Sequence, residues 1–423
     1  MKASKQHSIE VYVHWAGLAA RLVGTLHTTL SRGKEIFSFV YCNDWLKDRN
    51  AHRLDPALQL FQGIQYVPHG QENFNVFLDS SPDRWGRFLM DRREAQLARK
   101  EARPVRHLLE SDYLLGVYDE YRMGALRFRT DPNGPFLDNN KAQASPPWTS
   151  LRELAHASLA IEKEDAYKNP NYSKWLQMLV VPGSSLGGTR PKASVLDDNK
   201  HLWIAKFPSQ HDMHDVGAWE MVLHNLAQKL KITTAQANVK KYNTRHHTFM
   251  SKRFDRTEKG ERIHFVSAMT LLQRTDGDNA STGTSYLEIA ELIMREGSQP
   301  TQDLEQLWRR IVFFICVSNV DDHLRNHGFI LGERGWILAP AYDVNPVPSA
   351  NGLKLNISES DNDQDLELAK EVAAYFRLKP NQANHIIQET VKIVSGWHKE
   401  ATHFGISHEE KDCMARAFRI AEQ

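Results

Sequence analysis

Cysteine is scarce in this sequence of 423 residues, and its three cysteines, Cys42, Cys316 and Cys413, lie far apart. That number and spacing exclude a disulfide framework and a structural zinc site built from clustered cysteines. Long apolar runs are lacking too, since no window approaches the ~18 uncharged apolar residues of a transmembrane helix. The first residues contain no apolar core like that of a signal peptide. We therefore expect a cytoplasmic protein with no membrane partner.

A net charge of one sign is also lacking. The 53 Lys and Arg residues nearly balance the 52 Asp and Glu residues, which leaves a formal net charge of +1. Such a chain has no overall attraction to nucleic acid or to an anionic membrane. With 41% hydrophobic and 25% charged residues the composition is that of a folded globular protein. The length exceeds the ~250 to 300 residues at which single cores stop growing, so we expect about two domains.

The chain begins with strand patterns and becomes mainly helical later. Residues 9–15 alternate between apolar and polar, and 22–26 and 36–41 are rich in β-branched or aromatic residues, which predicts a small N-terminal sheet. Residues 131–149 are dense in Pro, Gly, Asn and Ser, which indicates a linker. A β-rich subdomain is therefore expected over 1–130, followed by this linker.

A glycine-rich segment follows the linker. The stretch PGSSLGGTRPKASV, residues 182–195, places Gly183, Gly187 and Gly188 beside small hydroxyl residues, so backbone N–H groups could approach a phosphate closely. It fits neither the GxxxxGK[ST] nor the kinase GxGxxG pattern, and an ordinary turn remains an alternative.

The next segment predicts a hairpin that carries a lysine among apolar residues. Residues 192–196 and 202–208 form its two strands, with Lys206 on the second. Because burial of an unpaired ammonium costs several kcal/mol, Lys206 must reach solvent, pair with a carboxylate or bind a phosphate. A helix predicted over 215–231 offers Glu220 as that carboxylate. Two strands follow at 236–242 and 247–253, and this order of elements is that of a kinase N-lobe.

The strongest chemical pattern lies in the helical half. The apolar stretch 307–320 predicts a buried helix that leads into DDHLRNHGFIL, residues 321–331. Asp321 and Asn326 have the D-x-x-x-x-N spacing of a kinase catalytic loop, in which the Asp orients the substrate hydroxyl and the Asn binds Mg²⁺.

A second predicted hairpin, residues 327–340, leads to Asp343 at the position of the second kinase metal ligand. Carboxylate and amide oxygens are ligands that suit Mg²⁺. The alternative is an Asx-turn at Asp343 before Asn345 and Pro346.

Seven stretches in this order resemble the HipA-like serine/threonine kinases, which are toxins of bacterial type II toxin–antitoxin systems. The first is residues 79–92, which end in PDRWGRFLMDR, and the others are MGALRF, SSLGGTRPKA, IAKFP, SKRFDR, NVDDHLRNHGFIL and LAPAYDVNP. The resemblance implies an α+β chain: the β-rich subdomain, then a two-lobed protein-kinase-like fold. Its N-lobe would span 150–254, and its mainly helical C-lobe would span 255–423.

The resemblance also implies roles for individual residues. Lys206 would anchor ATP, Asp321 would be the catalytic base, and Asn326 and Asp343 would bind Mg²⁺. The remaining positions are the hinge backbone of Lys252, Arg253 and Phe254 for adenine, Gly187 and Gly188 over the phosphates, and Ser185, or its neighbour Ser184, as the autophosphorylated serine. Two departures are Pro191, which stiffens the end of the loop, and Asp322, which could share a metal.

By resemblance, the substrate is a protein of the translation machinery, such as an aminoacyl-tRNA synthetase. The expected partner is a HipB-like helix-turn-helix antitoxin, through which the chain would associate with DNA indirectly. Two other functions remain open. One is a catalytically silent pseudokinase that acts as a corepressor beside the antitoxin. The other is a metal-dependent phosphohydrolase with Asp321, Asp322, His323 and His327 as ligands.

Overall fold

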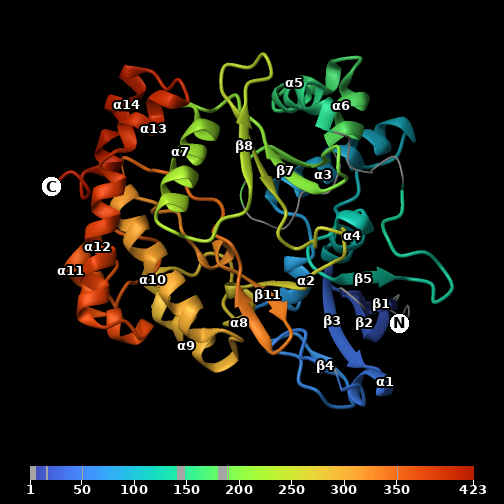
Figure 1. Cartoon of the computed structure of the whole chain (residues 1–423). Coiled ribbons are helices and arrows are strands. Elements are labelled where there is room, and N and C mark those ends of the chain that lie inside the picture. Colours follow the sequence, from blue (N-terminus) through green and yellow to red (C-terminus); the bar gives the residue numbers. More distant parts are fainter. Residues whose placement is uncertain are drawn as a thin grey trace. The chain divides into compact units, whose positions relative to one another are not determined.

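The structure is a computed structural model that describes residues 6–15, 18–49, 51–140, 148–179, 188, 190–349 and 351–423. Contacts within the chain divide it into two compact units, Met1–Gln210 with Asp255–Val266, and His211–Phe254 with Ser267–Gln423. Figure 1 labels many of the helices and strands of both. The four segments expected from the sequence remain a prediction, because these units group residues by contact alone. No helix within the described ranges is long and apolar enough to cross a membrane.

The first unit contains a five-stranded sheet with the order β4-β3-β2-β1-β5. Its strands are β1 (Gln6–Val13), β2 (Arg21–Ser31), β3 (Lys34–Tyr41), β4 (Gln65–Tyr66) and β5 (Leu126–Arg129), all paired antiparallel. Every second residue of β1 and of β3 is buried on one face, as their alternating pattern requires: Ile9, Val11, Val13, Phe37, Phe39 and Tyr41. The predicted N-terminal sheet is confirmed.

Among the described residues, this part of the first unit also contains α-helices and 3₁₀ turns. They are α1 (Asn43–Leu46), α2 (Asn75–Asp79), α3 (Arg84–Lys100), α4 (Glu110–Leu115), η1 (Asp119–Tyr121), η3 (Trp148–Ser150), α5 (Leu151–Ile161), η4 (Ala166–Lys168) and α6 (Tyr172–Leu179). The Asp83 carboxylate caps α3 by accepting a hydrogen bond of 2.8 Å from Gly86 N. Part of the predicted linker packs back on the unit, because Leu137 N donates to Phe128 O of β5.

The predicted lysine hairpin is confirmed in the first unit. Strands β6 (Lys192–Leu196) and β7 (Leu202–Lys206) pair antiparallel with Lys192 opposite Lys206. The Asp197 carboxylate closes the turn by accepting hydrogen bonds from Asn199 N and His201 N. The segment Asp255–Val266 also belongs to this unit, where Gly124 N donates to Asp255 Oδ2 at 2.8 Å. Strand β10 (Phe265–Ser267) begins at the end of this segment.

The second unit begins with a helix and a hairpin, both at their predicted positions. Helix α7 (Val216–Lys229) starts after Asp215, and β8 (Ala237–Lys240) pairs antiparallel with β9 (Thr248–Lys252). The rest is mainly helical: α8 (Ala268–Leu271), η5 (Ala280–Thr282), α9 (Tyr286–Glu296), α10 (Pro300–Val317), η6 (Leu324–Asn326), α11 (Leu366–Glu371), η7 (Ala373–Phe376), α12 (Pro380–Val394), α13 (Trp397–His403), α14 (His408–Met414) and η8 (Ala415–Phe418). A second predicted hairpin, β11 (Gly328–Gly332) with β12 (Gly335–Leu338), is confirmed as well.

Helix α10 is the central helix of the second unit. Its last seven residues, 311–317, are all buried, and Figure 1 shows it beside α12. The helix ends at Ser318, which adopts a left-handed backbone with φ 49° and donates its hydroxyl to Ala417 O at 2.8 Å. The loop that begins at Asn319 therefore starts from a helix end that is buried and held by a hydrogen bond.

Candidate functional site

Asp321 and Asn326 lie on the loop that follows α10. The Asp321 side chain is 79% exposed, whereas Asn326 is buried and its Nδ2 donates to Asp321 O at 3.3 Å. The other amide atom, Asn326 Oδ1, is buried without a hydrogen-bond partner in the described part of the chain. A buried oxygen of this kind indicates a position that awaits a ligand or water. The structure thus places an exposed carboxylate and a buried amide oxygen that has no hydrogen-bond partner among the described residues on one loop.

Asp343 follows β12 and adopts a left-handed backbone with φ 59°. The residue is half-buried. Asn345 N, the donor that an Asx-turn at Asp343 would need, donates instead to Asn319 Oδ1 at 3.0 Å. This bond argues against the Asx-turn and ties the Asp343 segment to the end of α10.

Tyr342 connects three segments to which the sequence assigned roles. Its hydroxyl donates to Arg325 O at 2.7 Å, next to Asn326. Its ring stacks on Phe254 with centroids 5.6 Å apart and an interplanar angle of 29°. Because Tyr342 also precedes Asp343, it links the predicted hinge, the Asp321 loop and the Asp343 segment.

The predicted hinge lies at the end of β9. Lys252 N donates to Gln236 O at 2.8 Å, so this amide already has an acceptor within the unit. Arg253 is buried and Phe254 is half-buried against Tyr342. The adenine role of this segment remains a prediction, and it would depend on backbone groups other than Lys252 N–H.

Asp322 faces the interior, unlike Asp321. It is 1% exposed, and its Oδ2 accepts hydrogen bonds from Tyr286 Oη at 2.7 Å and from His327 Nε2 at 2.6 Å. Asp322 and His327 are therefore engaged with each other inside the protein, which counts against a metal-dependent phosphohydrolase that uses both as ligands. Among the described residues, no group of three His, Cys, Asp or Glu side chains is arranged to hold a metal ion.

Lys206 and Gly188 belong to the first unit. Lys206 is half-buried at the end of β7, whereas its cross-strand partner Lys192 is 3% exposed. Lys192 Nζ forms an ion pair of 2.8 Å with Asp83 Oδ2, and it lies 3.6 Å from where a Cβ on Gly188 would be. The deep burial expected at Lys206 is therefore found at Lys192. Lys206 is the last residue of β7, whereas Lys192 is the first residue of β6 and packs against the start of α3.

Three predicted positions, Gly187, Ser184 and Ser185, lie outside the described residues. Glu220 is buried on α7 of the second unit, whereas Lys206 belongs to the first. The proposed pairing of Glu220 with Lys206 therefore remains a prediction.

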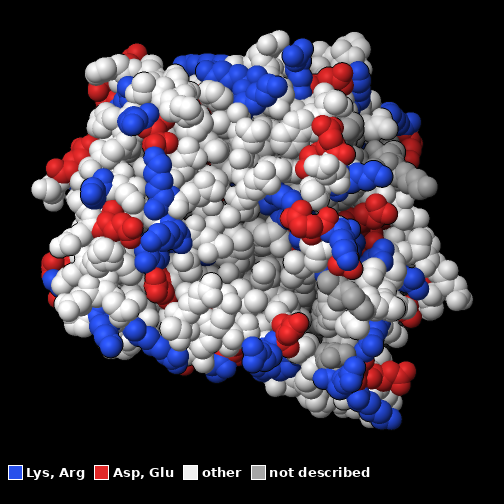
Figure 2. Space-filling model, viewed as in Figure 1, with Lys and Arg blue, Asp and Glu red and all other residues white. Residues whose placement is uncertain are grey.

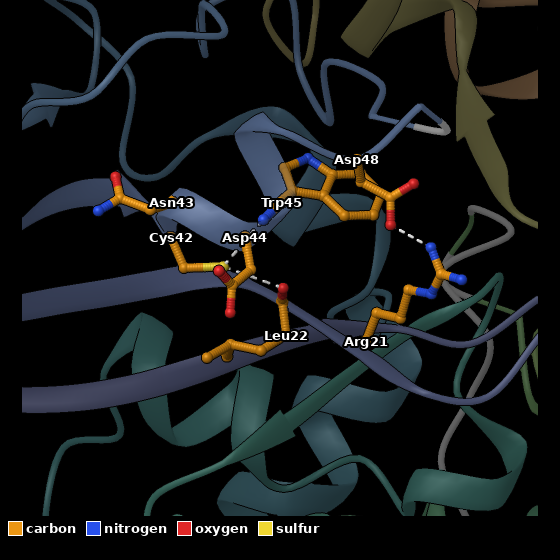
Figure 3. Close-up of a pocket in the computed structure, with 7 residues that line it drawn as sticks. All are labelled: Arg21, Leu22, Cys42, Asn43, Asp44, Trp45 and Asp48. Carbon is orange, nitrogen blue, oxygen red and sulfur yellow. Dashed lines mark hydrogen bonds and ion pairs between the residues drawn. The ribbon is translucent and has the colours of Figure 1, made fainter.

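A small pocket of about 320 Å³ lies near the N-terminal sheet (Figure 3). Arg21 forms an ion pair with Asp48 at its side, and Cys42 Sγ donates to Leu22 O at 3.2 Å. The pocket includes none of the predicted site residues. Basic and acidic side chains are interspersed on the face shown in Figure 2, in keeping with the near-zero net charge.

Sequence reasoning did not identify Lys192, Tyr286 or Tyr342 as important. One feature of the sequence could have indicated that Lys192 is buried: it lies between Pro191 and the apolar strand, at the start of a buried hairpin. Tyr342 had a weaker signal, since it directly precedes Asp343. Tyr286 had none, because its partner lies 36 positions away in sequence.

Comparison with known proteins now identifies the family. The model of the HipA-like C-terminal domain matches residues 184–397, just over half of the chain. The chain belongs to the HipA-like family. This HipA-like region contains Gly188, Lys206, the hinge, Asp321, Asn326 and Asp343.

This HipA-like chain was also compared with solved structures. HipA of Shewanella oneidensis, solved with HipB and operator DNA, aligns with a TM-score of 0.63 and 18% identity over 98% of this chain and 96% of that one. This likeness confirms the α+β, HipA-like kinase fold. The Helicobacter pylori proinflammatory kinase CtkA aligns with a TM-score of only 0.36 and 14% identity, over 55% of this chain and 94% of that one.

One curated relative comes from Haemophilus influenzae and bears the name "Putative kinase". It is 25% identical over 187 residues, which cover 39% of this HipA-like chain and 54% of the relative. The chain thus spans about half the length of the curated relative it matches.

Proposed function

We propose that this protein transfers the γ-phosphoryl group of ATP to a serine or threonine of a protein. The observation that carries the proposal is Asn326 Oδ1, which is buried and has no hydrogen-bond partner among the described residues, on the same short loop as the exposed Asp321 and within the family match. This loop presents one group that can reach a substrate and one that can hold a cation. Both features suit phosphoryl transfer, which depends on positioning and charge neutralisation.

Each predicted residue has a task in this reaction. Asp321 would orient the substrate hydroxyl and accept its proton as the oxygen bonds to the γ-phosphorus and the bond to ADP breaks. Its 79% exposure leaves it accessible to a protein substrate. Lys206 would hold the ATP phosphates, with Gly187 and Gly188 over them, and the hinge backbone near Arg253 and Phe254 would bind adenine.

The donor set near this loop fits Mg²⁺. Asn326 offers an amide oxygen that has no partner among the described residues, and Asp343, a half-buried residue, offers a carboxylate. Hard oxygen donors in small number are what Mg²⁺ takes from proteins when phosphates supply other ligands. Bound by Asn326 and Asp343, Mg²⁺ would offset the negative charge on the phosphates.

The first prediction tests these assignments. Asp321→Ala, Asp343→Ala and Lys206→Ala should each lower incorporation of radiolabelled phosphate from γ-labelled ATP by at least about 100-fold, because each removes a positioned charge. Circular dichroism and thermal unfolding should show that the variants fold. Thr390→Val, in the buried part of α12, is the control and should keep wild-type incorporation.

Unchanged incorporation in Asp321→Ala would contradict the assignment of the base. Intact mass after incubation with Mg·ATP separates a kinase from a pseudokinase. A gain of about 80 Da, the mass of one phosphate, supports autophosphorylation, and stabilisation by ATP without that gain supports binding alone.

We further propose that the protein is a growth-arresting toxin of the HipA type. The supporting observations are the family match and the fold shared with HipA of Shewanella oneidensis, which was solved with HipB and operator DNA. A HipB-like antitoxin would be its partner, and DNA would be reached through that antitoxin. The target would be a component of translation, for instance an aminoacyl-tRNA synthetase. Phosphoproteomics after induced expression, comparing wild type with Asp321→Ala, would identify it.

A further inference from the structure

Two neighbouring carboxylates on the loop after α10 face opposite environments. Asp321 is 79% exposed, whereas Asp322 is 1% exposed. A carboxylate this deeply buried must be compensated by hydrogen bonds or by a cation. The residues that offset the cost of burying the Asp322 carboxylate therefore indicate its role.

Two donors converge on one oxygen of Asp322. Tyr286 Oη, at the first turn of α9, lies 2.7 Å from Oδ2, and His327 Nε2 lies 2.6 Å from the same atom. Since a carboxylate only accepts hydrogen bonds, the tyrosine hydroxyl and the imidazole Nε2–H are both donors. Burial and the nearby Asp322 raise the pKa of Tyr286 well above its usual value, so the phenol keeps its proton.

Arg310 on α10 offsets the charge of Asp322. Arg310 is buried, and one of its terminal nitrogens donates to Ala339 O at 2.6 Å. Burial lowers the pKa of Arg310 to about 10, and the attraction of Asp322 opposes that decrease. The guanidinium stays charged at neutral pH, so a buried positive charge offsets part of the charge of Asp322.

The bond between Asp322 and His327 closes the loop that carries the predicted catalytic groups. Asp322 directly follows Asp321, and His327 directly follows Asn326. The Asp322–His327 hydrogen bond therefore joins the residue next to Asp321 to the residue next to Asn326. His327 is itself fixed: its carbonyl accepts from Ala268 N at 2.7 Å, and its ring packs edge-on against Tyr286 and Phe314. The distance between Asp321 and Asn326 therefore depends on an internal hydrogen bond.

We propose that Asp322 is a positioning residue that sets the geometry of Asp321 and Asn326 through His327 and Tyr286, and that it is not a metal ligand. The proposal rests on the proposed kinase function for its catalytic consequence. Its structural part, that Asp322 holds the loop 321–327 in place, does not depend on the kinase function. Tyr286 is the informative partner, because its hydroxyl donates to Asp322 and its removal changes no predicted catalytic side chain chemically.

The experiment compares Tyr286→Phe, Asp322→Asn and the control Thr390→Val. Thr390→Val also removes one buried hydroxyl bond, that of 2.8 Å to Ile386 O, but in α12. Hydrogen–deuterium exchange without nucleotide measures how firmly residues 321–327 are held, and steady-state kinetics separates kcat from the KM for ATP. The Mg²⁺ concentration for half-maximal phosphorylation is measured for all variants.

We expect kcat to fall about 10-fold or more in Tyr286→Phe and Asp322→Asn, with KM for ATP within about threefold of wild type, since misplacement mainly affects the chemical step. Tyr286→Phe combined with Asp322→Asn should be no worse than Asp322→Asn alone, because both substitutions act through Asp322. The loop amides should exchange faster in both variants and not in Thr390→Val.

Wild-type kcat and wild-type loop exchange in Tyr286→Phe would overturn the proposal. An Asp322→Asn defect confined to a higher Mg²⁺ requirement, with unchanged loop exchange, would also overturn it and make Asp322 a ligand. If the wild-type protein transfers no phosphate, the proposed function fails, and the exchange measurement still decides whether Asp322 holds the loop.

Discussion

Lys192 and Asp83 form a deeply buried ion pair at the start of the β6–β7 hairpin of the first unit, with side chains 3% and 1% exposed. Lys192 stands opposite Lys206 in the β6–β7 register, and like charges directly across a hairpin repel. Asp83 offsets one of the two charges while its other oxygen caps α3 through Gly86 N. One carboxylate therefore joins the start of α3 to the strand that follows Gly188.

The second prediction concerns this pair. Lys192→Met should lower the free energy of unfolding by about 3 kcal/mol or more, because it leaves the Asp83 carboxylate buried without its cation. Chemical denaturation measures the loss. The matched control is Lys192→Met with Asp83→Asn, which removes both charges and keeps an acceptor for Gly86 N. The double variant should regain most of the stability, and a double variant as unstable as the single one would contradict this explanation.

Among the elements, α7 and the β8–β9 hairpin approach each other very closely. A Cβ on Gly217 would lie 2.4 Å from His247 O, closer than real atoms come. Asp215 explains the approach, since its carboxylate caps α7 through Ala218 N and also accepts from His247 N at 2.8 Å and His247 Nδ1 at 2.6 Å. These bonds hold the helix start against the hairpin that leads to the predicted hinge.

The third prediction tests that contact. Gly217→Ala should lower the free energy of unfolding by about 1–3 kcal/mol, because the added methyl group must displace backbone. Helix propensity alone predicts the opposite sign, a gain of up to about 1 kcal/mol. The sign of the change in urea unfolding therefore separates the two explanations, and a more stable variant would disprove the close approach.

At the scale of the molecule, His264 makes stability depend on pH. It lies in the segment 255–266 of the first unit, is buried, and packs near Trp15 with ring centroids 5.8 Å apart. Burial, with a smaller contribution from His52, lowers its pKa from 6.5 to about 3. Below pH 6.5 the unfolded chain therefore binds a proton that the folded chain does not, so the contribution of His264 to stability is lost as pH falls toward 3.

The fourth prediction follows from this difference in proton binding. Between pH 7 and pH 5, His264 alone should lower the free energy of unfolding by about 2 kcal/mol, because its imidazole becomes protonated in the unfolded chain and not in the folded one. His264→Phe keeps an aromatic ring and does not titrate, so its unfolding free energy should fall less over this range. Denaturation at both pH values measures the difference, and parallel losses in wild type and variant would contradict the assignment to His264.

Local patterns predicted much of the fold and part of the site. The strands around Ile9 and Phe37, both hairpins and helix α7 followed from alternation, turn residues and apolar spacing, which act between neighbours in sequence. The same local patterns placed Asp321 and Asn326 on one loop. They did not predict that Lys192 would be the buried lysine, because the covering helix α3 lies about a hundred residues earlier in the chain.

By itself, the sequence determined the elements, their order, the family and the spacing of Asp321 and Asn326, since these depend on short-range patterns along the chain. Only the tertiary structure decided which of two adjacent aspartates faces solvent, that Tyr286 and His327 hold the other, and that Tyr342 joins Phe254 to the loop. The physical reason is that burial and hydrogen-bond partners are set by distant segments that packing brings together, and no local pattern records them.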